Sequence, residues 1–176
     1  AGLYDELVEV ATEAGVVLAP LAIVRGAVRI GLTADEMSAL LGPDPMPKIG
    51  SRDLARVIAD RASGALTVSG ALAIARLAGL PLIVTGGLGG VQRGAGDVSA
   101  DLVELTRGST AVVCAGFKPF LDAAATRERL ASLGVPIYGI GTTAIPALMT
   151  NDSGTNADAA VADAAAAADI LAIQHR

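Results

Sequence analysis

Strand-like and helix-like segments alternate along this 176-residue chain, and glycine or proline stands at most of the junctions between them. Runs of branched apolar residues, such as 82–85 and 110–116, predict buried strands, whereas the spacing of apolar residues over 3–14 and 118–133 predicts helices. Apolar strands that alternate with helices are typical of a largely parallel sheet covered on both faces. We therefore predict one α/β domain over residues 1–176, with its ligand site at the carboxyl ends of the strands.

Short polar side chains mark the predicted beginnings of several helices. Thr33 and Glu36 form a capping-box pattern, and Ser51, Ser69 and Ser99 each precede a helical segment. A proline-rich loop over 41–47 leads to a short predicted strand at 48–50. The alanine-rich stretch 158–174 predicts a C-terminal helix.

The composition excludes several kinds of chemistry. The single histidine, His175, stands next to the last residue, and the single cysteine, Cys114, lies in an apolar run, so we expect neither a Ser-His-Asp triad nor an internal disulfide. With a formal net charge of -5 and no basic run, the chain offers no surface for nucleic acid. No apolar run approaches the ~20 residues that cross a membrane. We expect a cytoplasmic protein without a secretory signal, in which Cys114 is an inert core residue and His175 is solvated.

Lysine occurs at two positions only, 48 and 118, whereas eleven basic residues are arginine. General arginine usage explains this count as well as function does, but only lysine can lose its proton and attack a carbonyl. Lys118 follows a predicted strand and opens a predicted helix, among Phe117, Pro119 and Phe120. The helix dipole and these apolar neighbours would lower its pKa, as a Schiff-base lysine requires.

The segment 86–101 places four glycines directly after a predicted strand, where their amides can approach an anion closely. It is not a Rossmann fingerprint, because Gln92 stands where the third glycine belongs. A phosphate-binding loop, to which Arg93 would add charge, and an ordinary surface loop both fit the pattern. Asp97 and Asp101 flank Ser99 at a helix start, where acids either cap the helix or hold a divalent cation.

Taken together, these segments resemble the pseudouridine-5'-phosphate glycosidase family. The resemblance rests on TGGLGGVQRGA (85–95), DVSAD (97–101) and VCAGFKPFLD (113–122), and it covers nearly the whole chain, becoming weaker after Thr143. It implies a three-layer α/β/α fold with a largely parallel sheet, and a homotrimer. It also implies reversible cleavage of the C–C glycosidic bond of pseudouridine 5'-phosphate, giving ribose 5-phosphate and uracil, through a lysine imine assisted by Mn²⁺.

The resemblance assigns roles to individual residues. Lys118 matches the family's imine lysine, and Asp97 matches its ligand for Mn²⁺ or another divalent cation. The positions that match its substrate-binding residues are Lys48, Val68, Ser99, Ala100 and Asp101. We therefore expect a small sugar phosphate or nucleotide as the partner, and no nucleic acid or membrane.

The sequence departs from the family pattern in the site segments. Gln92 replaces a histidine and cannot titrate near neutral pH as histidine does. Gly50 and Ser51 replace a Ser-Arg pair after Lys48, and the loop before Asp97 is shorter.

The family also has an earlier strand that carries a catalytic glutamate, and a further region at its C-terminal end. We expect this chain to lack both, because its sequence starts after that strand and does not continue into the further region. Glu6, Glu9 and Glu13 do not match the catalytic glutamate, since they lie on the predicted helix that follows the strand. Two alternatives therefore stay open: a weakly active or inactive homologue that binds a sugar phosphate, and a C-glycoside enzyme for a base other than uracil.

Overall fold

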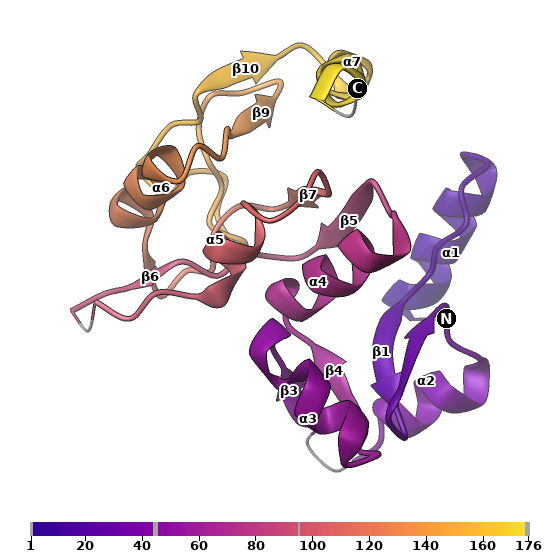
Figure 1. The fold of residues 1–176 in the computed structure, drawn as a ribbon. Helices are drawn as coiled ribbons and strands as arrows, with labels where there is room; N and C mark the ends of the chain where they lie inside the picture. Colours follow the sequence, from indigo (N-terminus) through magenta and orange to yellow (C-terminus); the bar gives the residue numbers. More distant parts are fainter. Residues whose placement is uncertain (1, 44–45, 95, 175–176) are drawn as a thin grey trace. The chain divides into compact units, whose positions relative to one another are not determined.

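The computed structural model describes residues 2–43, 46–94 and 96–174 of the chain. It divides into two compact units, residues 1–66 and 67–176 (Figure 1). One domain that spans both units stays a prediction. His175, part of the proline-rich loop (44–45) and one residue of the glycine-rich segment (95) lie outside the described residues.

The first unit is built around a small mixed sheet with the strand order β2-β1-β4-β3. β1 pairs antiparallel with β2 and β4, whereas β3 and β4 are parallel. Ala22, Ile23, Ile49 and Val57 form its buried core. Its described elements are α1 (Leu3–Glu13), β1 (Leu21–Val24), β2 (Ala27–Ile30), α2 (Ala34–Leu40), β3 (Lys48–Ile49), the 3-10 helix η1 (Ser51–Asp53), α3 (Leu54–Ala59) and β4 (Gly64–Leu66).

Local sequence signals explain two features of this unit. The turn between β1 and β2 consists of Arg25 and Gly26, which both have positive φ, as the tight turns of twisted hairpins require. The capping box before α2 is confirmed, since the Thr33 hydroxyl accepts from the Glu36 amide and the Glu36 carboxylate accepts from the Thr33 amide.

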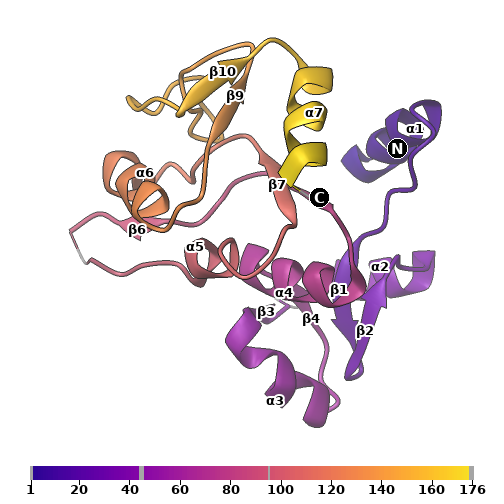
Figure 2. The same ribbon diagram turned by 45° about the horizontal axis from the view of Figure 1, so that its top comes forward.

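The second unit contains parallel strand pairs covered by helices. β5 pairs parallel with β7, β9 pairs parallel with β10, and the short strands β6 and β8 pair antiparallel. Figure 2 shows α7 beside the β9–β10 pair, which it contacts. The described elements are α4 (Val68–Ala78), β5 (Leu82–Thr85), β6 (Val91–Gln92), α5 (Ala100–Glu104), β7 (Ala111–Cys114), β8 (Leu121–Asp122), α6 (Ala123–Ser132), β9 (Tyr138–Ile140), β10 (Ala159–Val161) and α7 (Ala164–Gln174).

The predicted α/β class with parallel strands is therefore confirmed. Helix α4 shows how a helix packs in this fold, since it contacts β5 through a buried apolar face. Leu72, Ala73, Ile74 and Ala75 are buried on it, and the helix stops at Gly79, whose φ of +68 suits a residue without a side chain. No helix within the described ranges is long and apolar enough to span a membrane.

The structure corrects the expected ends of several elements. The helix expected from residue 118 begins at Ala123, because Leu121 and Asp122 pair with β6 as strand β8 and the Asp122 side chain caps the helix. The cap of α4 is Thr67 rather than Ser69. Ser51 begins a 3-10 turn whose cap is Gly50.

The alanine-rich stretch 158–174 forms a strand and a helix rather than one helix. Residues 159–161, expected to be helical, form β10 and pair with β9, and the helix begins only at Ala164. Alanine has a high helix propensity, but tertiary pairing overrides it here.

Candidate functional site

The chain after β5 forms a glycine-rich turn over residues 86–90, which lies against residues 115–118 after β7. The amide of Ala115 donates to the carbonyl of Gly86 (3.0 Å), and the amide of Leu88 donates to the carbonyl of Gly116 (2.9 Å). The parallel pairing of β5 and β7 thereby continues to a bridge between Leu88 and Phe117. The carboxyl ends of both strands thus meet, at the edge where parallel sheets hold ligands.

Lys118 stands at this edge, directly after the bridged residues. It is half-buried, and its backbone amide donates to the carbonyl of Leu88 (3.2 Å). Its Cγ lies 3.4 Å from the position that a Cβ on Gly87 would occupy, so its stem packs against the glycine-rich turn. Since α6 begins at Ala123, the prediction that a helix dipole acts on Lys118 is wrong. Its role as an imine lysine stays a prediction.

Gly116 allows the chain to turn before Lys118. Its φ is +79, and a Cβ there would collide with the carbonyl oxygen of Pro146. The same carbonyl accepts from the amide of Phe117 (3.2 Å), and the amide of Leu148 donates to the carbonyl of Ala115 (2.9 Å). Residues 146–148 are therefore held beside the segment that carries Lys118.

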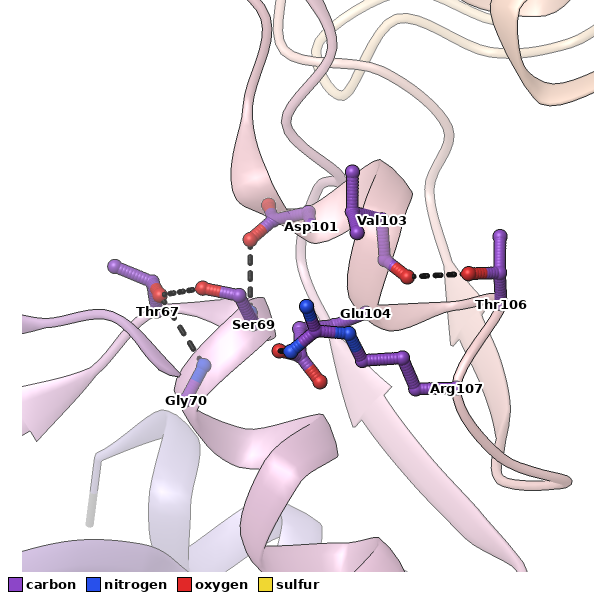
Figure 3. A network of polar contacts seen from close by, with 8 residues as sticks. All are labelled: Thr67, Ser69, Gly70, Asp101, Val103, Glu104, Thr106 and Arg107. Atoms are coloured by element: carbon purple, nitrogen blue, oxygen red, sulfur yellow. Dashed lines mark hydrogen bonds and ion pairs between the residues drawn. The ribbon is translucent and has the colours of Figure 1, made fainter. Parts of the chain in front are cut away.

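The carboxylate of Asp101 joins the beginning of α4 to the glycine-rich turn, and Figure 3 shows its bond to Ser69. The side chain is 3% exposed; its Oδ1 accepts from the amide of Ser69 (2.8 Å), and its Oδ2 accepts from the amide of Gly89 (3.0 Å). A Cβ at Gly89 would lie 2.6 Å from Oδ2, so only glycine permits this approach. We call Asp101, together with the backbone amides of Ser69 and Gly89 that it binds, the Asp101 clamp. It favours a structural role for Asp101 in holding the glycine-rich turn to the beginning of α4, and direct contact with substrate stays a prediction.

The other predicted substrate-binding residues of the second unit are Val68, Ser99 and Ala100. Ser99 caps α5 as expected, and its Oγ accepts from the amide of Asp101 (3.2 Å). Ala100 is exposed, whereas Val68, the first residue of α4, is 8% exposed. The structure thus brings Ser99, Ala100 and Asp101 next to the glycine-rich turn. Their contacts with substrate stay predictions.

Thr126 is a supporting residue that the sequence did not reveal. It is fully buried on α6, accepts from the amide of Val91 (3.0 Å) and donates to the carbonyl of Asp122 (2.6 Å). A Cβ on Gly90 would lie 2.5 Å from its Cγ2. Thr126 therefore fixes the far end of the glycine-rich turn.

Asp97, the expected metal ligand, is not part of a cluster of potential metal-binding side chains in the described part of the chain. Its side chain is exposed, and its backbone carbonyl accepts from the amide of Gln92 (2.8 Å). Among the described residues, no three His, Cys, Asp or Glu side chains gather as a metal-binding group. One carboxylate fits a cation of the magnesium or manganese type that keeps water and substrate oxygens as its other ligands. It does not fit a cation held by protein ligands alone.

Lys48 belongs to the first unit. It is exposed and forms the first residue of β3, whereas the sequence pattern favours a place at the end of a short strand; it pairs with Ala65 of β4. That Lys48 joins the other predicted residues at one site stays a prediction. Arg93 donates from Nε to the carbonyl of Leu121 (2.9 Å), and its charge for an anion stays a prediction.

Two further features concern β5, β7 and the segments that lead into them. Cys114 is the last residue of β7 and is half-buried, so the prediction of a core position is wrong, but burial raises the pKa of its thiol above the usual value, which agrees with low reactivity. A hollow of about 180 Å³ is lined by Arg76, Leu80, Arg107 and Thr110 among others. It is formed by the last turn of α4 and by the segments that lead into β5 and β7, so it lies at the amino ends of these strands, away from Lys118.

The sequence matches the family of indigoidine synthase A like proteins over residues 2–176. The chain belongs to this family. Two similar curated proteins are named pseudouridine-5'-phosphate glycosidase: the protein of Chloroflexus aurantiacus is 46% identical over 167 residues, and that of Nocardioides sp. is 43% identical over 179 residues. These matches cover 93% and 96% of this chain but 55% and 58% of the relatives, so the chain spans little more than half of their length.

Solved structures of family relatives have the same fold. An indigoidine synthase A-like protein from Thermotoga maritima matches with a TM-score of 0.92 and 31% identity, covering 98% of this chain and 59% of the other. The prealnumycin C-glycosynthase AlnA, solved in complex with ribulose 5-phosphate, matches with a TM-score of 0.90 and 31% identity, covering 97% and 57%. The family resemblance of the sequence motifs is thereby confirmed.

Proposed function

We propose that this chain takes part in cleaving and forming the C–C glycosidic bond of pseudouridine 5'-phosphate, with Lys118 as the group that binds the sugar covalently. The observation that carries the proposal is the position of Lys118, half-buried against Gly87 where the carboxyl ends of β5 and β7 meet. The names of the curated relatives support this substrate, and the sugar phosphate bound to the related C-glycosynthase supports its class.

The chemistry requires an amine because uracil leaves poorly from a closed ribose. The lone pair of the Lys118 Nζ would attack the anomeric carbon, and the bond to the ring oxygen would break as that oxygen takes a proton. The bond to uracil would then break while the C=N bond forms, with a proton taken up at C5 of uracil. Water would release ribose 5-phosphate and restore the amine.

Other residues would bind and position the substrate. The resemblance assigns this work to Lys48, Val68, Ser99, Ala100 and Asp101. In the described geometry, the Asp101 clamp keeps the glycine-rich turn in place beside Lys118. Asp97 would hold Mn²⁺ or a similar cation, which supplies positive charge for sugar or phosphate oxygens when bound.

The resemblance also supports a homotrimer, and the single cysteine agrees with a reducing, cytoplasmic compartment. We include both in the proposal. Light scattering coupled to size-exclusion chromatography gives the molar mass in solution, and a monomer at micromolar concentration would contradict the trimer.

Sugar binding without turnover is a second candidate function, and a base other than uracil is a third, favoured by the C-glycosynthase relative. The test is to incubate the chain with ribose 5-phosphate, reduce it with borohydride and measure the intact mass. A single reduced adduct that Lys118→Arg abolishes is the expected result, since arginine stays protonated and forms no imine. An adduct without release of uracil from pseudouridine 5'-phosphate would favour the second candidate, and no adduct would contradict the imine.

A further inference from the structure

Leu148 is an unusual residue at the edge that carries Lys118. Its φ is +53, a left-handed conformation that a leucine rarely adopts. Its backbone is fixed there, because its amide donates to Ala115 while the preceding Pro146 accepts from Phe117. A single antiparallel bridge between Gly116 and Ala147 adds to this attachment. Strained backbone held by its surroundings is a feature of ligand-binding sites.

The Leu148 side chain lies over the glycine-rich turn. Its Cδ1 is 3.5 Å from the position of a Cβ on Gly86 and 3.6 Å from that on Gly87. The stem of Lys118 touches the same Gly87 position at 3.4 Å. A methyl group at Gly87 would therefore contact both side chains, so Leu148 and Lys118 border one small space.

This apolar side chain is not part of the core. Leu148 is 39% exposed and the adjacent Met149 is 81% exposed, so water reaches both. An apolar surface beside a lysine offers nothing to a phosphate or to ribose hydroxyl groups. The part of a nucleotide that gains from such contact is the flat face of its base.

We propose that Leu148 is a specificity-determining residue, whose side chain contacts the base of the nucleotide held at Lys118. The proposal rests on the proposed function. The strained turn places the Leu148 side chain over Gly86 and Gly87, beside the stem of Lys118. The side chain offers only apolar contact there. In the proposed function other residues bind the sugar phosphate, so the contribution of Leu148 would be confined to the base.

The test compares ligands with and without a base. Isothermal titration calorimetry, carried out in a Lys118→Arg background so that the nucleotide is not cleaved, measures the affinity for pseudouridine 5'-phosphate. Borohydride trapping, with Lys118 intact, measures the rate of adduct formation with ribose 5-phosphate. For Leu148→Ala we expect the affinity for the nucleotide to fall by about tenfold, as for removal of apolar contact in a binding site. The rate of trapping should stay within about twofold of wild type, since ribose 5-phosphate carries no base to contact.

Three further variants separate the side chain from the strain. Leu148→Met keeps the volume and should bind the nucleotide as wild type does. Leu148→Gly removes both the side chain and the backbone strain, and it should bind the nucleotide as weakly as Leu148→Ala. Leu77→Ala alters a 79% exposed leucine on α4 and should change neither readout.

Each outcome identifies which proposal fails. If Leu148→Ala weakens both readouts equally, or changes neither, the base contact is wrong. If Leu148→Gly binds the nucleotide normally, the strain and not the side chain is responsible, and the inference is again overturned. If wild type neither binds the nucleotide nor forms an adduct, the proposed function itself fails, and the base contact fails with it.

Discussion

Replacing Asp101 by asparagine tests the clamp that organises the candidate site. The buried carboxylate accepts from two backbone amides, those of Ser69 and Gly89. Asparagine has one acceptor oxygen, so it can satisfy one amide, and its NH₂ group would then face the other. Asparagine has nearly the same size and shape as aspartate, so the effect of the substitution reports on hydrogen bonding.

The expected loss of stability follows from these two bonds. A hydrogen bond to a charged group contributes about 1.5–3 kcal/mol, and a buried donor left without a partner costs about 1–3 kcal/mol. Asp101→Asn weakens one bond and leaves one buried amide without a partner. We therefore expect the free energy of unfolding to fall by about 2–4 kcal/mol, a large part of the roughly 5–15 kcal/mol typical of a folded protein.

Urea unfolding followed by far-ultraviolet circular dichroism measures this loss. With a denaturant slope of about 2 kcal/mol per molar, the midpoint should move by about 1–2 M. Asp97→Asn is the matched control, since Asp97 is exposed, and it should change stability by less than about 0.5 kcal/mol. Hydrogen exchange should show faster exchange at the amides of Ser69 and Gly89 in Asp101→Asn. Unchanged stability together with unchanged protection at both amides would refute the clamp.

Other residues give independent predictions. Gly90→Ala should destabilise the fold by about 1–3 kcal/mol in urea unfolding, because the new methyl group would lie 2.5 Å from the Thr126 Cγ2; wild-type stability would contradict this close contact. The backbone amide of Thr33, with help from Arg29, holds the pKa of Glu36 below its usual value of 4.5. The stabilisation from Glu36 is therefore complete above that value and disappears as the pH falls through the lowered pKa; an NMR titration that gives Glu36 an ordinary or raised pKa would disprove it. Because burial raises the pKa of the Cys114 thiol, iodoacetamide at neutral pH should modify it much more slowly in the folded chain than in urea, and equal rates would count against this.

Features specified by neighbouring residues could be predicted from the sequence. The capping box of Thr33 and Glu36, the cap of α5 at Ser99 and the helix end at Gly79 each depend on residues within one turn. The strands around 82–85 and 111–114 followed from their branched apolar side chains. These elements were enough to predict the α/β class and the strand end that precedes Lys118.

Features that depend on distant partners could not be predicted in this way. Strand β8 delays the helix after Lys118 because its partner β6 lies some thirty residues earlier in the chain. Asp101 pairs with amides 32 and 12 residues away, so its spacing suggests only a cap or a metal ligand. No pattern in the sequence marks Leu148, whose position depends on a backbone hydrogen bond to Ala115.

The most direct measurement of the central claim locates the reduced ribose 5-phosphate adduct on the chain. Trypsin separates the two lysines, because Lys118 lies in the peptide 108–127 and precedes a proline, whereas Lys48 ends a different peptide. Tandem mass spectrometry is expected to find the adduct on Lys118 in wild type and in Lys48→Arg, and none in Lys118→Arg. An adduct on Lys48 alone, or an unmodified 108–127 peptide after saturating sugar phosphate and borohydride, would contradict the assignment of Lys118 as the imine lysine.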